Sequence, residues 1–122
     1  MEAFECRIAA SRELVSMRSE LRRFLERGHV SEDALADSVM ACHEACAGTL
    51  EETPLARRVR IHAQVDADGV WIAVTGRVAD LDCDEALPSR VAERRNLIAS
   101  LMDSASWIAT AGQLVIVMSR QG

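Results

Sequence analysis

Apolar residues recur with two different periods along this chain, and the two periods predict strands and helices in separate segments. Phe4, Cys6 and Ile8 alternate with charged residues, which is typical of a strand with one buried face. The same alternation runs on both sides of residues 66–69, DADG, whose residue types favour a turn and therefore a β-hairpin. Together with two short apolar segments that flank Gly112, the predicted strands cover residues 4–8, 59–65, 70–75, 107–109 and 114–117.

Apolar residues spaced three or four apart predict three helices between these strands. Ser11 and Ser31 are the expected N-caps of the first two helices, and Gly28 is the expected C′ residue of the first. A third helix is expected from residue 89 to 102 or 103, after a predicted loop over residues 76–88. The stripes consist of Leu14, Met17, Leu21, Phe24 and Leu25, then Leu35, Val39, Cys42, Cys46 and Leu50, then Val91, Ile98, Leu101 and Met102.

The order of these elements is β-α-α-β-β-α-β-β, and it bounds the fold class. At 122 residues the chain is expected to form a single domain over residues 1–122. We predict an α+β fold, a two-layer sandwich in which one mixed or antiparallel sheet carries its helices on one face. This arrangement buries the strand faces and the helical stripes most simply.

Composition narrows the classes of function. The net charge of −5 argues against a nucleic-acid partner, since nucleic-acid-binding proteins usually carry a basic face. All 14 basic residues are arginine, which excludes a Walker-type phosphate loop with its essential lysine. No apolar run reaches the roughly 20 residues that span a bilayer, and the N-terminus lacks the features of a signal peptide. We therefore expect a cytoplasmic protein without a membrane partner, and the arginine- and alanine-rich composition indicates a GC-rich, bacterial genome.

The cysteines raise the question of a metal or thiol site. Cys42 and Cys46 would share one face of a helix, while His43 would point about 100° away. A zinc site would need Cys6 or Cys83 as a further ligand. The sequence favours buried core thiols and no metal, and a thiol or metal sensor that uses Cys42 and Cys46 stays open as an alternative.

Four segments carry a resemblance to a known family: residues 35–45, LADSVMACHEA, 70–74, VWIAV, 97–103, LIASLMD, and 112–116, GQLVI. In that order they resemble an N-box helix, the strand before a first glycine box, the helix after a second glycine box and a closing strand. These are the parts of the GHKL family, whose members share a histidine kinase-like ATPase fold. The resemblance points to the small serine-kinase branch, which consists of anti-sigma factors that inhibit sigma factors and phosphorylate antagonist proteins.

The resemblance assigns the role of general base to Glu44, but it also exposes missing groups. The family has an Asn one helical turn later that holds Mg²⁺, whereas this chain has Gly48, which offers no oxygen to a hard cation. After its strand the family has an Asp that accepts the adenine amino group, followed two residues later by Gly. Here those positions are Gly76 and Val78. A buried adenine amino group without its acceptor would cost roughly 1–3 kcal/mol.

The second glycine box is also degenerate. The family presents bare backbone amides to the phosphates there, and this chain has Arg94, Arg95 and Asn96 instead. Glycine allows the backbone to approach a phosphate closely, and that freedom is lost. The two arginine side chains remain candidate contacts for an anion.

These departures favour a non-catalytic regulatory binding protein over an enzyme, with no cofactor and no bound nucleotide. The resemblance implies a sigma factor or an anti-sigma antagonist as the partner, whose functional face this chain would mask until a competitor displaces it. The alternative is an ATP- and Mg-dependent protein serine kinase and anti-sigma factor. In that alternative Glu44 acts as general base, and Arg94 or Arg95 replaces the backbone contacts to phosphate.

The candidate partner-binding residues are Arg18, Arg22 and Arg23 of the first helix and Trp71 of the hairpin. Trp71 lies on the opposite strand face from its apolar neighbours and would be exposed if the helices leave that face uncovered. Because family members often pair as dimers, a homodimer through the open sheet face or the first helix is a further expectation.

Overall fold

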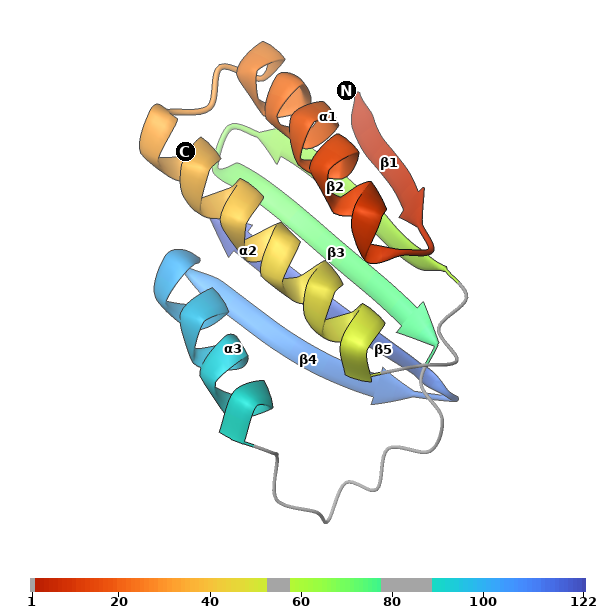
Figure 1. Cartoon of the computed structure of the whole chain (residues 1–122). Coiled ribbons are helices and arrows are strands. Elements are labelled where there is room, and N and C mark those ends of the chain that lie inside the picture. Colours follow the sequence, from red (N-terminus) through yellow and green to blue (C-terminus); the bar gives the residue numbers. More distant parts are fainter. Residues whose placement is uncertain (1, 53–57, 78–88) are drawn as a thin grey trace.

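The computed structural model describes residues 2–52, 58–77 and 89–122. The elements follow one another as β1 (Ala3–Ile8), the 3-10 turn η1 (Ser11–Glu13), α1 (Leu14–Arg27), α2 (Glu32–Glu52), β2 (Val59–Asp66), β3 (Gly69–Arg77), α3 (Ser89–Leu101), β4 (Ser104–Thr110) and β5 (Gln113–Arg120) (Figure 1). The strands form one sheet in the order β1-β2-β3-β5-β4, with an antiparallel pairing at each step. The predicted α+β sandwich is confirmed, and its described sheet is antiparallel rather than mixed.

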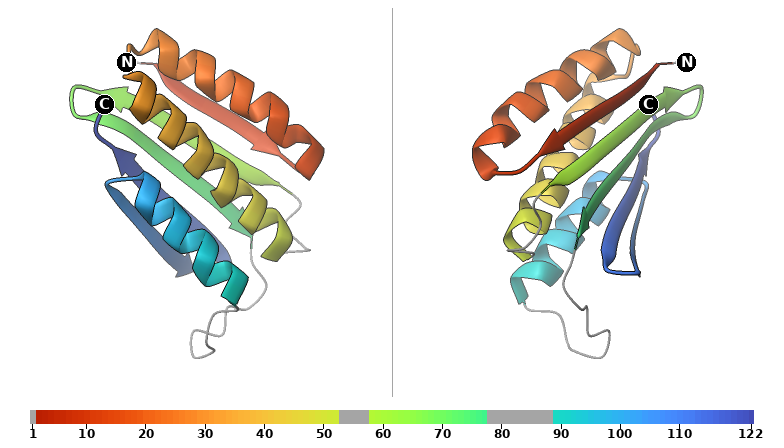
Figure 2. Two further views of the ribbon diagram at one scale, coloured as in Figure 1. Left: turned by 60° about the vertical axis from the view of Figure 1, so that its left-hand side comes forward. Right: turned by 90° about the vertical axis from the view of Figure 1, so that its right-hand side faces the viewer.

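All three described helices lie on the same face of the sheet (Figure 2). Their apolar stripes pack on alternate strand residues, so the core lies between the two layers, and Val39 and Leu50 are half-buried at its margin. None of the described helices is long and apolar enough to span a membrane. The largest fully buried side chains include Met17, Leu21, Leu25, Leu35, Ile61, Ile72, Ile98 and Met118.

The opposite face of the sheet is covered by none of the described helices, and we call it the open face. It carries the strand residues that alternate with the buried ones. Trp71 is 45% exposed there, as the alternation along β3 predicts. The open face comprises Ala3, Glu5, Arg7, Arg60, His62, Gln64, Asp66, Trp71, Ala73, Thr75, Arg77, Ser104, Ser106, Ile108, Thr110, Gln113, Val115, Val117 and Ser119.

The predicted N-cap of the first helix is wrong. Ser11 begins the 3-10 turn η1 and does not cap α1. Glu13 instead turns its carboxylate back, and its Oε1 accepts hydrogen bonds from the backbone N–H groups of Ala9 (3.0 Å) and Ala10 (3.2 Å). The orphan amides before the helix are therefore satisfied by an acidic side chain at the third position of the turn.

The junction between α1 and α2 follows the prediction in part. Gly28 ends α1 as expected, but its φ is −80°, and the left-handed conformation falls on His29, with φ of 58°. The predicted cap at Ser31 is confirmed, because its Oγ accepts a hydrogen bond from the backbone N–H of Ala34 at 3.3 Å.

The start of the predicted 76–88 loop is also wrong. Gly76 and Arg77 belong to β3, where they pair with Leu114 and Gln113 of β5. β5 lies nearly 40 residues further along the chain, and its pairing with β3 extends β3 beyond the alternation of apolar residues that predicted it. The rest of that predicted loop, including Val78 and Cys83, lies outside the described residues.

Candidate functional site

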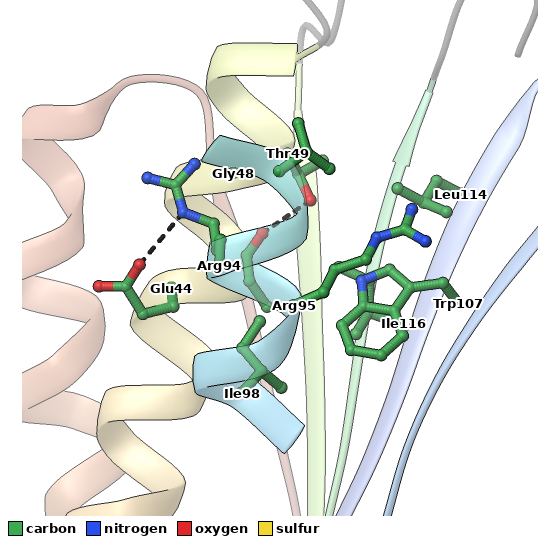
Figure 3. Close-up of a pocket in the computed structure, with 11 residues that line it drawn as sticks. Glu44, Gly48, Thr49, Arg94, Arg95, Ile98, Trp107, Leu114 and Ile116 are labelled. Atoms are coloured by element: carbon green, nitrogen blue, oxygen red, sulfur yellow. Dashed lines mark hydrogen bonds and ion pairs between the residues drawn. The ribbon is translucent and has the colours of Figure 1, made fainter. Parts of the chain in front are cut away.

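The site implied by the resemblance lies where α2 and α3 approach each other above β5 and β4 (Figure 3). Glu44 and Gly48 are one turn apart on α2 and share a face, as the sequence predicts. Both line a small cavity between the helices and the sheet. The other lining residues are Ala45 and Thr49 of α2, Val91, Arg94, Arg95 and Ile98 of α3, Trp107 of β4, and Leu114 and Ile116 of β5.

Glu44 is held by an arginine of the facing helix. The Nε of Arg94 donates to Oε2 of Glu44 at 3.1 Å, and its Nη1 donates to Oε2 of Glu51 at 2.9 Å (Figure 3 shows the first contact). The hydrogen bond to Arg94 lowers the pKa of Glu51, and the same bond raises the pKa of Arg94. Arg94 thus cross-links α2 and α3, and two carboxylates compensate its charge.

Gly76 faces α2 and is packed against Thr49. A Cβ atom added at Gly76 would lie 2.3 Å from Cγ2 of Thr49, a distance that real Cβ atoms do not show. Thr49 is 2% exposed, and its hydroxyl donates to the carbonyl oxygen of Ala45 at 2.7 Å, which fixes its rotamer. The GHKL family that this chain resembles carries Asp at the position of Gly76. In this chain the methyl group of Thr49 fills the space that such a side chain would need.

The two arginines of α3 point in different directions (Figure 3). The guanidinium of Arg95 lies over the ring of Trp107, with 5.0 Å between Cζ and the ring centroid, while Arg94 turns toward Glu44. Such a cation–π contact holds Arg95 against β4. Asn96 is exposed on α3. The predicted anion contacts therefore do not converge on one point, and each arginine already has a partner within the chain.

Space differs on the two sides of Glu44 and Arg94. A hollow of about 520 Å³ lies beside His43, Glu44, Glu51 and Arg94, whereas little space remains between α2, α3 and the sheet. The cavity has a volume of about 10 Å³, which is near the lower limit for a single water molecule. Among the described residues, with 78–88 left aside, the site has no oxygen ligand at Gly48 and no acceptor at Gly76. These two described positions therefore lack the side-chain oxygens that the family this chain resembles uses for Mg²⁺ and adenine.

The candidate partner-binding residues do not form one surface. Arg22 and Arg23 are exposed on α1, and Arg22 pairs with Glu26 at 3.6 Å. Arg18 turns inward, and its Nη1 contacts Nδ1 of His43 on α2 at 3.2 Å. Burial, followed by the charge of Arg18, lowers the pKa of His43. Trp71 lies on the open face, opposite the face that the described helices cover.

The thiols of α2 lie in the core. Cys42 and Cys46 are fully buried, and both they and Cys6 are free thiols. A hydrogen bond with Cys42, together with burial, raises the pKa of Cys46 well above its ordinary value. A thiol with a raised pKa is a poor nucleophile at neutral pH. Within the described part of the chain, no three His, Cys, Asp or Glu side chains are arranged to hold a metal ion.

Sequence reasoning did not single out Thr49 or Glu51. A signal for Glu51 exists, because it follows Glu44 by seven residues, or two helical turns, and therefore shares its face. Thr49 carries no such signal, since its role depends on the placement of α2 over β3.

Comparisons with known proteins support the fold. No protein-family model matches the chain, and no curated protein matches it. The fold is similar to the crystal structure of the RsbU and RsbW domains of Rv1364c from Mycobacterium tuberculosis, with a TM-score of 0.78 and 17% sequence identity. The match covers 99% of this chain and 33% of that chain, so this chain spans about a third of the length of that protein.

Proposed function

We propose that this chain is a non-catalytic regulatory protein that acts by binding a protein partner, in the manner of an anti-sigma factor. The observation that carries the proposal is the packing of Gly76 against Thr49, with 2.3 Å between a Cβ at Gly76 and Cγ2 of Thr49. An Asp at that position, which would accept the adenine amino group, has no room. Adenine recognition as in the GHKL family requires this Asp, and the packing of Thr49 against Gly76 is incompatible with it.

The second support is the state of Glu44. Its carboxylate is bound to Arg94 at 3.1 Å, and Arg94 is bound to Glu51 as well. A general base must be within hydrogen-bond reach of the proton that it removes. Here the guanidinium occupies that reach, and the neighbouring Gly48 supplies no ligand for Mg²⁺. The described residues therefore give the kinase alternative little support.

The class of partner follows from the fold and the resemblance. The matched crystal structure contains an RsbW domain, and the GHKL anti-sigma factors that the sequence resembles include proteins of that name. We infer a sigma factor or an anti-sigma antagonist as the partner. The chain would cover the partner's functional face, and a competitor would release it.

The test combines a binding assay with a phosphorylation assay. Each sigma factor and each anti-sigma antagonist encoded in the same genome is purified and mixed with the chain, and complexes are detected by size-exclusion chromatography with light scattering. The proposal expects a defined complex with at least one of them without nucleotide. With radiolabelled ATP and Mg²⁺, it expects no label on any partner, as with the Glu44→Gln control. Label transfer that Glu44→Gln abolishes would establish the kinase instead.

A further inference from the structure

The open face contains a transverse row of side chains that changes from basic to apolar. The strand registers align Arg7 of β1, Arg60 of β2, Thr75 of β3, Val115 of β5 and Ile108 of β4 in a single line. The two arginines occupy one end of the row and the two apolar residues occupy the other. Such an ordered division on a face that no described helix covers is typical of a recognition surface.

The basic end of the row holds two arginines beside a single carboxylate, that of Glu5. Arg7 and Arg60 are directly opposite each other on neighbouring strands, a pairing of like charges that destabilises a sheet. Neither side chain forms an ion pair with a described residue. Both line a hollow of about 330 Å³ whose wall also includes Glu5, His62, Thr75 and Gln113, so the two arginines share this hollow with one carboxylate. An anionic group in this hollow would remove the repulsion.

The apolar end of the row continues onto neighbouring strands. Ile108 is 47% exposed, and Val115 and Val117 are half-buried beside it. Trp71 is exposed on the same face. Exposed aromatic and aliphatic side chains next to arginine are the composition that protein–protein interfaces favour.

A second copy of this chain would not balance these arginines. Two carboxylates lie at this surface in the described strands, those of Glu5 and Asp66, and each has a hydrogen-bond partner within the chain. Glu5 contacts His62 at 3.3 Å, and Asp66 accepts hydrogen bonds from the backbone of its own turn at Asp68 and Gly69. A face-to-face pair of copies would therefore bring together Arg7, Arg60 and Arg77 of each copy with only Glu5 and Asp66 to compensate them.

We propose that the open face binds an acidic amphipathic segment of a partner protein, with its carboxylates at Arg7 and Arg60 and its apolar side chains over Val115, Val117 and Ile108. The inference rests on the proposed function, because it names the surface and the chemistry of the partner that the function requires. It also separates the surface from the arginines of α1, which lie on the other side of the sheet.

The test uses three synthetic helical peptides as probes. The first carries a leucine stripe flanked by glutamates, the second has lysine in place of each glutamate, and the third is a scrambled version of the first. Each peptide is titrated into the ¹⁵N-labelled chain and followed by NMR. We expect the acidic peptide to shift the amide signals of Arg7, Arg60, Thr75 and Val115, and we expect neither of the other peptides to do so.

Charge reversal provides the decisive comparison. Arg7→Glu with Arg60→Glu should weaken binding of the acidic peptide about tenfold and create binding of the lysine peptide. The milder Arg60→Gln should weaken it by a smaller factor, which keeps the test available if the double variant does not fold. Arg12→Glu with Arg27→Glu, an equal charge change in η1 and α1, should leave binding unchanged.

Several results would overturn the inference. Absence of binding, shifts confined to the helices, or equal affinity for the acidic and scrambled peptides would each reject the open face as the docking site. Concentration-dependent shifts at Trp71 and Ile108 without peptide would replace the partner with a second copy. These failures leave the proposed function standing if a sigma factor or antagonist still binds elsewhere, whereas label transfer from ATP would reject that function whatever the peptides do.

Discussion

Because Gly76 packs against Thr49, a substitution of Gly76 that would ordinarily raise the free energy of unfolding is expected to lower it. Glycine inside a strand costs roughly 0.5–1 kcal/mol relative to alanine, so Gly76→Ala would ordinarily stabilise the protein. Here the new Cβ would lie 2.3 Å from Cγ2 of Thr49, more than roughly 1 Å inside the usual contact distance of about 3.5–4.0 Å between carbon atoms. We therefore expect Gly76→Ala to destabilise the fold.

The magnitude follows from the opposing terms. Overpacking of a filled core costs about 1–3 kcal/mol, and the strand preference of alanine offsets about 0.5–1 kcal/mol. The net loss is about 1–2 kcal/mol, or a decrease in Tm of roughly 4–8 °C for a domain of this size. Thr49 cannot simply rotate away, because its hydroxyl is bonded to Ala45 at 2.7 Å.

Thr49→Ser is the matched partner for this variant, since it removes Cγ2 and keeps the hydroxyl. In the Thr49→Ser background, Gly76→Ala should be neutral or stabilising by up to about 1 kcal/mol. Urea unfolding of the four proteins, followed by circular dichroism, gives the coupling energy, which we expect to be about 2 kcal/mol. Effects that add within about 0.5 kcal/mol would show that the two residues do not touch, and the reasoning about the occupied Asp position would fail.

Three further predictions concern the surroundings of the site. Arg94→Met should lower the free energy of unfolding by about 1 kcal/mol, because it removes the ion pairs to Glu44 and Glu51. The loss of stability should shrink at high salt, and a loss that does not depend on salt would contradict the role of these ion pairs. Because the pKa of His43 is lowered in the folded chain, the unfolded chain binds a proton more readily, so stability should fall as pH drops below about 6.5. His43→Gln should reduce that fall. The same pH profile in the wild-type chain and in His43→Gln would refute the role of His43. In a Cys6→Ser, Cys83→Ser background, Cys42 and Cys46 should react with a thiol reagent only after unfolding, because both are buried. Labelling of the folded chain, detected by mass spectrometry, would contradict their place in the core.

The order of the elements could be predicted from the sequence because each element has its own local period. The stripe through Leu35, Cys42 and Cys46 predicted the buried side of α2, and the alternation around Trp71 predicted the uncovered face of β3. The same local reasoning placed the end of β3 too early. Gly76 and Arg77 are strand residues only because β5 pairs with them, and no local pattern carries that information.

The candidate site could be predicted only in outline. Glu44 and Gly48 share a helix face by spacing alone, so their neighbourhood was available from the sequence. The ion pair of Glu44 with Arg94 and the contact of Thr49 with Gly76 depend on how α2 is placed against α3 and β3. The opposition of Arg7 and Arg60 depends on strand register, since a shift of one residue would move each side chain to the other face.

The central proposal is that this chain binds no magnesium–nucleotide complex, because Thr49, Arg94 and Arg95 take up the space between α2, α3 and the sheet. A titration of the ¹⁵N-labelled protein with Mg-ATP, followed by NMR up to millimolar nucleotide, tests it most directly. We predict that the amide signals of Glu44, Gly48, Gly76 and Arg94 do not move. Saturable shifts at these four amides, absent with Mg²⁺ alone, would contradict the account.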